Sequence, residues 1–563
     1  MNEQADILFV NARVVDVFTG RIIQREVAVK DGFFQGFGPY PAKKTVDLEN
    51  RYMVPGLLDA HVHIESSMVP PARFAKAVLA CGTTTCIADP HEIANVAGLD
   101  GIRYMIDAAE GQLVNIRFAL PSCVPATHME TAGAAITAGE MEDIIRHPRI
   151  AALGEMMNFP GVIHRDPEIL SRIDLALKAR KPVDGHAPGL TGGDLYAYVR
   201  AGISTDHECT RPEEAKEKLE CGMHIMIREG TCAKNLDDLF PVIDEHTARR
   251  MMWCTDDRHP EEILTQGHVD HILRRAVAKG LDPVRAIQMG TITCAEHFRL
   301  HDAGAVAPGR RADFIVTDSL EDFRPGTVYA NGILAARNGV FCAEGPEEAA
   351  APSLEVMHLD GGDIDLAIPA QPGKVRVIEV ISDQVVTQST LLPPSVQNGL
   401  AVADPERDMA KITVIERYTG KAGTGRGFVR GLGLSKGALA SSVAHDSHNI
   451  VTAGTNDRDM HKAVRKVIEM KGGFAVALDG EIVETLPLEI AGLMTDLPVK
   501  EVEERMKSVI RAARSLGCPL NDPFMALGFL ALPVIPELKI TDKGLVDVNR
   551  FQIVDLFVEE RNQ

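Results

Sequence analysis

The sequence predicts an α/β protein: a (β/α)8 barrel of the TIM-like kind, with a small β-sandwich domain built from both flanks and a C-terminal α+β domain. Three observations predict it. Short apolar runs alternate with helical stretches eight times across the middle of the chain. Strand-like alternation both precedes and follows that region. The 563 residues also exceed what one compact core accommodates.

The two flanks share a texture of alternating apolar and polar residues. "ILFVNARVVDVFTG" and "REVAVKDGFFQGFG" near the start alternate with Gly and Asp at the turns, and the same pattern returns between residues 304 and 340. Period-two alternation bounded by turn residues is typical of strands that are buried on one face. We therefore expect one composite β domain from residues 1–55 and 305–345.

The middle segment carries the barrel signal. Eight apolar runs, each followed by a helical pattern, occupy about 250 residues, which is the usual size of a (β/α)8 barrel. We assign it to residues 56–304. A stretch rich in Pro and Glu (343–356) reads as a linker, and residues 365–563 are long enough for a C-terminal domain with its own core.

Composition limits the classes of partner. The formal net charge is −20, which argues against a nucleic-acid surface and favours a small-molecule substrate. No apolar run reaches the length of a membrane span, and the first residues lack a secretory signal. Ten scattered cysteines without a CxxC pair indicate reduced thiols. We expect a cytoplasmic protein that contacts no membrane and forms a homo-oligomer, a dimer.

Polar residues recur where the predicted barrel strands end. In a (β/α)8 barrel these ends meet at one mouth, where active sites are built. A single buried histidine is more often a hydrogen-bonded core residue than a ligand. Six imidazole or carboxylate groups at strand ends need a shared partner, because burying each unpaired would cost several kcal/mol. The predicted metal ligands are His61, His63, Glu155, His186, His207 and Asp256.

Four histidines and two carboxylates exceed the needs of one tetrahedral ion with an open position. They suit two divalent ions that share a bridging hydroxide and a bridging carboxylate, an arrangement that lowers the pKa of bound water. The set contains no thiolate, so manganese, iron, zinc and cobalt all fit, and we prefer manganese or iron.

The motifs resemble a known family. "DAHVHIESS", "GHAPG", "STDHE", "CTDDR" and "APGRRADFIV" resemble the amidohydrolase superfamily over roughly residues 5 to 340. That family usually has a carboxylated lysine on strand 4, whereas "ALGEMMNFPGV" places Glu155 there. A carboxylate can bridge two metals directly. With "ADPHEIANVAG", "MIREG" and "VAHDSHNIV", the sequence resembles the bacterial adenine deaminases over nearly its whole length.

The resemblance implies hydrolysis of adenine to hypoxanthine and ammonia in purine salvage or catabolism, with a metal-bridging hydroxide attacking C6. It implies that Asp256 takes the proton of the water and passes it on. Glu155 is then the metal bridge, the donor to N1, or both. His91 in "DPHEIAN" would orient or polarise the nucleophile, although Asp89-Pro90-His91 also reads as a helix-capping turn. Predicted catalytic residues are Asp256, Glu155 and His91.

Residues beside these motifs are candidates for purine contacts or support of the ligands. They are Glu65, Ser66, Ser67, Arg228, Glu229, His448 and Asn449. The segment "AHDSHN" that holds the last two leaves three readings open: another metal site, a polar loop over the barrel mouth, or a local hydrogen-bonded turn. We favour the loop over the mouth.

Two other functions compete with deamination. A cyclic amide hydrolase similar to dihydropyrimidinase would share the barrel, but such enzymes usually carry the strand-4 lysine. A non-catalytic amidohydrolase-like scaffold would have lost its ligands first, whereas every expected position is filled here.

Overall fold

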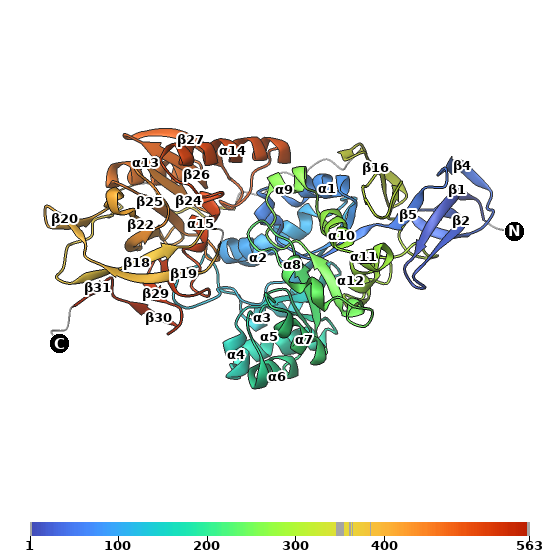
Figure 1. The fold of residues 1–563 in the computed structure, drawn as a ribbon, viewed down its shortest axis with the longest axis horizontal. Coiled ribbons are helices and arrows are strands. Elements are labelled where there is room, and N and C mark those ends of the chain that lie inside the picture. Colours follow the sequence, from blue (N-terminus) through green and yellow to red (C-terminus); the bar gives the residue numbers. More distant parts are fainter. Residues whose placement is uncertain (1–2, 345–353, 360–361, 363, 383, 560–563) are drawn as a thin grey trace. The chain divides into compact units, whose positions relative to one another are not determined.

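The structure is a computed structural model that describes residues 3–344, 354–359, 362, 364–382 and 384–559. It divides into two compact units (Figure 1). The first comprises residues 1–90, 105–123 and 137–350, and the second comprises 91–104, 124–136 and 351–563. Most of the predicted linker lies outside the described residues. Among the described residues, no helix combines the length and the apolar character that crossing a bilayer requires.

Eight parallel strands form the barrel of the first unit. Five pair in the order β10-β9-β8-β7-β6 and three in the order β11-β12-β13. Two parallel bridges, Val62 with Asp256 and Val183 with Ile203, join the two sets and close the ring. The fold class is therefore confirmed. The strands are β6 (Leu57–Val62), β7 (Thr83–Ala88), β8 (Asn115–Leu120), β9 (Ile150–Met156), β10 (Val183–Gly185), β11 (Thr205–Asp206), β12 (His224–Arg228) and β13 (Met251–Cys254).

The barrel interior is packed by small and sulfur-containing side chains. Leu58, Ile87, Met226, Met252 and Cys254 belong to one fully buried cluster. Strands that are buried on both faces have continuous apolar sequences. The middle segment therefore contains apolar runs in which apolar and polar residues do not alternate. Cys254, two residues before Asp256, fills the core.

Helices follow the strands along the chain. Several begin with a proline in their first turn, where the missing N–H costs nothing; α5 adds the Asp166 side chain as a cap that accepts from two backbone N–H groups. The helices of this unit are α1 (Pro71–Ala80), α3 (Ala138–Ile144), α4 (Phe159–Ile163), α5 (Pro167–Lys178), α6 (Gly192–Arg200), α7 (Pro212–Glu220), α8 (Leu236–Leu239), α9 (Pro260–Thr265), α10 (Val269–Ala278), α11 (Pro283–Met289) and α12 (Ile292–His297).

The flanks of the barrel segment build one nine-stranded sheet. Antiparallel pairing of β14 with β5 joins the late strands to the early ones, as the sequence predicted. Phe9, Phe314 and Tyr329 lie at the centre of its core, with the last two rings stacked 4.6 Å apart. The strands are β1 (Ala5–Asp16), β2 (Arg21–Lys30), β3 (Phe33–Phe37), β4 (Ala42–Asp47), β5 (Tyr52–Pro55), β14 (Phe314–Thr317), β15 (Thr327–Ala330), β16 (Ile333–Arg337) and β17 (Val340–Phe341).

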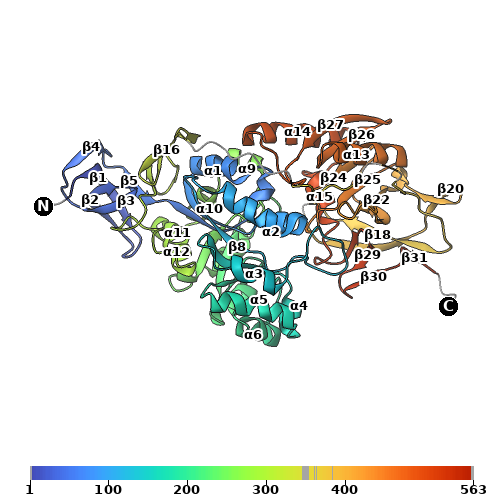
Figure 2. The same cartoon turned by 180° about the vertical axis from the view of Figure 1, so that it is seen from behind.

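The second unit has its own nine-stranded sheet, which follows the order β19-β18-β23-β22-β25-β24-β26-β27, with β31 pairing β18 (Figure 2). Helix α13 (Asp457–Glu469) buries Met460, Val464 and Val467 in the core of this unit. The main strands are β18 (Lys374–Val380), β19 (Thr387–Leu392), β22 (Met409–Ile415), β23 (Thr424–Arg430), β24 (Ala438–Ser441), β25 (Ile450–Gly454), β26 (Gly473–Leu478), β27 (Glu481–Pro487) and β31 (Phe557–Val558).

Smaller elements complete this unit. A hairpin and a three-stranded sheet accompany the main sheet, and two segments from the middle of the chain, 91–104 and 124–136, pack within the unit. The first segment begins α2 (His91–Ala108), whose remaining residues belong to the first unit. The other elements are β20 (Ser395–Gln397), β21 (Leu400–Val402), β28 (Leu538–Thr541), β29 (Gly544–Asp547), β30 (Gln552–Val554), α13 (Asp457–Glu469), α14 (Val499–Ser515) and α15 (Pro523–Phe529).

Candidate metal centre

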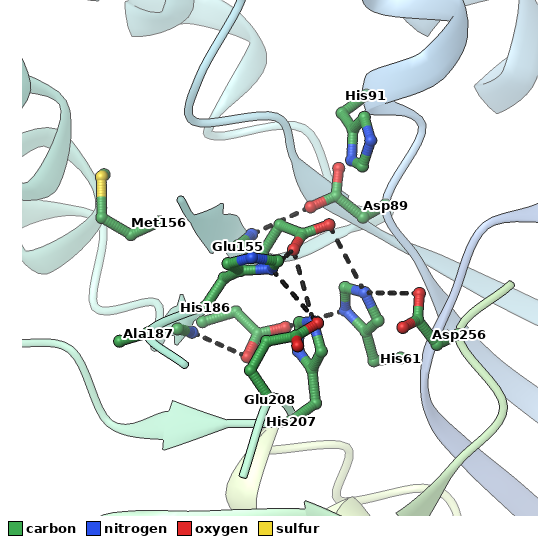
Figure 3. Close-up of polar contacts among 12 residues, drawn as sticks. His61, Asp89, His91, Glu155, Met156, His186, Ala187, His207, Glu208 and Asp256 are labelled. Atoms are coloured by element: carbon green, nitrogen blue, oxygen red, sulfur yellow. Dashed lines mark hydrogen bonds and ion pairs between the residues drawn. The ribbon is translucent and has the colours of Figure 1, made fainter. Parts of the chain in front are cut away.

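The carboxyl ends of the barrel strands bring six predicted ligands together. Figure 3 labels His61, Glu155, His186, His207 and Asp256 among them. They form overlapping groups in which every ligand atom lies within 4.8 Å of the others. These groups are His61, His63 and Asp256; His61, Glu155 and His207; and His186, His207 and Glu208. All of these residues except Glu208 were predicted from the sequence as metal ligands.

The closing seam of the barrel positions the first group. The backbone N–H of Asp256 donates to the carbonyl of His61 at 2.9 Å, and the N–H of His63 donates to the carbonyl of Asp256 at 3.2 Å. Asp256 has a φ of 55°, a left-handed conformation that aspartate adopts more readily than most residues. The seam therefore sets Asp256 beside His61 in β6 and His63 directly after it.

The hydrogen bonds made by Nδ1 of His61 and of His63 determine whether the Nε2 atoms of these rings can bind a metal. His61 Nδ1 lies 3.0 Å from Asp184 Oδ2, and His63 Nδ1 lies 2.9 Å from the Asp89 carbonyl. Both partners are acceptors, so each Nδ1 carries the hydrogen and each Nε2 of the neutral rings carries a lone pair. The two Nε2 atoms lie only 3.1 Å apart. With both rings neutral, these two lone pairs repel unless a cation lies against them. A proton, which the raised pKa of His63 favours, or a metal ion can serve, so this donor set fits a metal ion.

Glu155 is central to the site. Its Oε1 lies 3.2 Å from His63 Nε2, and its Oε2 lies 2.6 Å from His186 Nδ1 and 3.3 Å from His207 Nε2. One carboxylate oxygen thus faces the histidine that follows β6, and the other faces the histidines that follow β10 and β11. Both oxygens of Glu155 therefore lie against imidazole nitrogens that could bind a metal.

The backbone around Glu155 is fixed by Asp89. The N–H of Glu155 donates to Asp89 Oδ2 at 2.9 Å, and a Cβ on Gly154 would lie 2.1 Å from the same oxygen. Only glycine at 154 therefore allows this approach. The interpretation of Asp89 as a helix cap is wrong: Pro90 is the N-cap residue of α2 and no side-chain capping bond is present.

The charges at the site are matched. Burial alone would raise the pKa of Glu155, but His186 and its neighbours hold that pKa well below the ordinary value. Burial alone would lower the pKa of His63, but its hydrogen bonds to Asp256 and Glu155 raise it well above the ordinary value. Ionised carboxylates therefore draw positive charge onto the imidazoles, and a divalent cation can replace those protons.

Glu208, which sequence reasoning passed over, lies at the same site. Its Oε1 lies 3.6 Å from both His186 Nδ1 and His207 Nε2. The Arg228 guanidinium contacts both oxygens of Glu208 and also donates to Asp256 Oδ2 at 2.6 Å. The residue stood in the quoted motif "STDHE", directly after a predicted ligand, and that adjacency was the available signal.

The other predicted substrate residues of this unit already have protein partners. Ser66 and Ser67 belong to a short 3-10 helix (Ile64–Ser67) that also holds buried Glu65; Ser66 Oγ donates to Asp257, and Ser67 Oγ to the Ile64 carbonyl. Glu229 accepts from the Leu236 N–H at 3.0 Å and pairs with Arg275. These contacts support the loops at the strand ends, and a role in substrate binding stays a prediction.

His91, His448 and Asn449 belong to the second unit. His448 Nδ1 accepts from the Ala444 N–H at 3.2 Å, and burial lowers the pKa of His448 to about 4. The ring is therefore neutral, with its hydrogen on Nε2, which donates to Glu92. A metal on Nε2 would require the opposite tautomer and set Nδ1–H against the Ala444 N–H, so the geometry argues against a metal here.

The "AHDSHN" segment also forms a local turn. The N–H of His448 donates to the Ala444 carbonyl at 2.7 Å, and Asn449 Nδ2 donates to the Thr131 carbonyl at 2.8 Å. His445 Nδ1 lies 2.7 Å from Glu92 Oε1, and His91 Nε2 lies 3.4 Å from the same oxygen. Glu92 thus binds two histidines of the segment, and the suggested loop over the barrel mouth stays a prediction.

Comparisons with known proteins agree with this geometry. Residues 52–341 match the amidohydrolase family, and residues 384–552 match the adenine deaminase C-terminal domain. The chain is 52% identical to an adenine deaminase of Desulfatibacillum aliphaticivorans, over 98% of this chain and 97% of that protein. It is 47% identical to adenine deaminase 2 of Carboxydothermus hydrogenoformans, over 98% and 96%. The resemblance read from the motifs is confirmed, and the chain belongs to the adenine deaminase family within the amidohydrolases.

Proposed function

We propose that this chain hydrolyses adenine to hypoxanthine and ammonia, a reaction of purine salvage or catabolism. One observation carries the proposal: Glu155 stands between the histidine pair at the end of β6 and the histidines that follow β10 and β11, with one oxygen toward each. Family membership supplies the substrate, because the relatives of 45–52% identity are adenine deaminases.

Two divalent ions, manganese or iron, are the proposed cofactors, with zinc or cobalt as alternatives. The donor set contains only imidazole and carboxylate, which suits these metals. His61, His63 and Asp256 would hold one ion, His186 and His207 the other, and Glu155 both. Ions held by these residues would supply a nucleophile near neutral pH by lowering the pKa of a bound water.

The side chains of the site then carry the protons. Asp256 is the proposed acceptor for the proton of the water and its donor to the leaving amine, because its carboxylate lies at the barrel seam, 3.0 Å from His63. Arg228 holds Asp256 ionised: burial would raise the pKa of Asp256, but the guanidinium keeps it well below the ordinary value. Both oxygens of Glu155 face imidazoles, which favours its role as the bridge over a role as donor to purine N1. His91 is proposed to orient the nucleophile.

The test is a steady-state assay of the manganese-loaded full chain against adenine, other amino-purines, hydantoin and dihydrouracil. We expect ammonia release from adenine and about two ions per chain by metal analysis. Release of product from the cyclic amides alone would instead support the cyclic amide hydrolase, and less than one ion per chain without turnover would support the scaffold. The matched control is Glu155→Gln, which keeps the shape of the bridge and removes its charge.

Two further properties belong to the proposal. The ten cysteines are unpaired, in keeping with a reducing cytoplasm. A homodimer is proposed as the working assembly, and sedimentation of the full chain tests it.

A further inference from the structure

A lysine behind the metal centre has no part in the proposed chemistry. Lys218, in the last turn of α7, is fully buried. Its Nζ lies 2.7 Å from the Ala187 carbonyl, 2.5 Å from Asp206 Oδ2 and 2.7 Å from Glu214 Oε1. The ammonium therefore uses all three of its hydrogens on protein acceptors.

The partners of Lys218 are the neighbours of two proposed ligands. Ala187 follows His186, and Asp206 precedes His207. The Ala187 N–H donates to Asp206 Oδ1 at 3.0 Å, a contact visible beside His186 in Figure 3. Both polar groups of the residue after His186 are thus held by one ion pair: the N–H by Asp206 and the carbonyl by Lys218.

Stability alone does not account for this arrangement. A buried ion pair often contributes no more to stability than apolar side chains of the same volume, because desolvation offsets the attraction between the charges. A buried ion pair does fix the positions of the groups that it joins. Here it joins the carboxyl ends of β10 and β11, which are short strands of three and two residues.

We propose that Lys218 is a positioning residue of the metal centre, which sets the separation of His186 and His207 by tying the Ala187 carbonyl to Asp206. The inference rests on the proposed function, since it assumes that these two histidines share a metal ion. Lys218 touches neither substrate nor metal and acts through the backbone of its neighbours.

Three variants of the full chain test it: Lys218→Met, Glu214→Gln and Lys539→Met. Glu214→Gln weakens the ion cluster but leaves the tie between Ala187, Lys218 and Asp206. Lys539 is another fully buried lysine, in the second unit, bonded to two backbone carbonyls and to no carboxylate. Each variant removes a buried ionisable group, but only Lys218→Met removes the bonds that join the Ala187 carbonyl to Asp206.

Metal binding is read out directly by titrating Co²⁺ into the apo protein against a chelator and following the visible absorption of the bound ion. For Lys218→Met we expect a loss of affinity at one of two sites of about 10- to 100-fold, the range typical for residues that orient metal ligands. The absorption of that site should also change, because its ligand geometry changes. Glu214→Gln and Lys539→Met should retain the wild-type spectrum and affinity.

A wild-type spectrum and affinity in folded Lys218→Met would overturn the inference. If that variant does not fold, Lys218→Met with Asp206→Asn decides, because it removes the pair without leaving Asp206 as an unbalanced buried charge and keeps an acceptor for the Ala187 N–H. Wild-type Co²⁺ binding in this double variant would equally overturn it. Failure of the wild-type chain to bind Co²⁺ at all would instead remove the proposed function.

Discussion

Arg228 Nη1 lies 2.6 Å from Asp256 Oδ2 while the same guanidinium contacts both oxygens of Glu208. The arginine was predicted to contact the purine or to support the ligands. The structure gives it two carboxylate partners, Asp256 just after β13 and Glu208 just after β11, and contact with the purine stays a prediction. The planar guanidinium therefore aligns two acidic side chains at the barrel mouth. Mutating Arg228 tests this alignment.

Replacing Arg228 by Met should lower kcat/KM for adenine by at least about 100-fold, because both carboxylates lose a buried charge partner and Asp256 loses its orientation. Arg228→Lys should recover only part of the loss, since an ammonium cannot make the forked contact. Steady-state kinetics with a metal count check this. Full activity in the Met variant would show that Asp256 is oriented without the arginine.

Replacing Asp184 by Asn should weaken the centre through His61. Asp184 Oδ2 accepts from His61 Nδ1 and so leaves the lone pair of Nε2 facing the site. An amide can turn its NH2 toward Nδ1 and favour the opposite tautomer. We expect a loss of metal affinity of about 10- to 100-fold, measured by chelator competition. Unchanged affinity would mean that backbone geometry alone selects the tautomer.

Replacing Glu92 by Gln should destabilise the second unit by about 1–3 kcal/mol, because one of two buried histidines loses its acceptor. Glu130→Gln is the matched control. Burial raises the pKa of Glu130 well above its ordinary value, which favours the neutral carboxyl, and an amide resembles that form. Hydrogen exchange of residues 443–451 should rise for the first variant only; equal effects would contradict the assignment.

Lys539 predicts a pH dependence of stability. Burial lowers its pKa in the folded chain to about 7 from an ordinary value of 10.5. The unfolded chain then binds more protons between about pH 7 and 10.5, so this lysine makes stability rise with pH across that window and contributes no slope below it. Lys539→Met should remove the rise. Denaturation midpoints at pH 7 and 9.5 for both proteins measure it; identical slopes would show that Lys539 stays charged.

Much of the architecture was predictable because it repeats. Eight apolar runs with polar residues at their ends identified the barrel, and the periodic flanks identified the composite sheet. His61, His63, Glu155 and Asp256 were predicted as ligands because each follows or ends such a run, and the topology of parallel strands brings them close together. Local pattern and global topology agree at these positions.

The residues that sequence reasoning missed act through distant partners. Asp89 was read as a local cap but accepts the N–H of Glu155. Asp184, which accepts from His61, and Lys218 were not singled out from the sequence at all. Such roles depend on which strand ends become neighbours at atomic distance, and nothing in the spacing of residues along the chain encodes them.

The second unit draws residues 91–104 and 124–136 from within the barrel region. A ribosome releases these segments long before the residues after 350 that they pack with. During synthesis, Glu92 emerges before its partners His445 and His448 have been made, so its bonds to them form only late. Domains tend to fold as they emerge from the ribosome, N-terminal first. The second unit of this chain can complete its folding only after the residues beyond 350 have been synthesised.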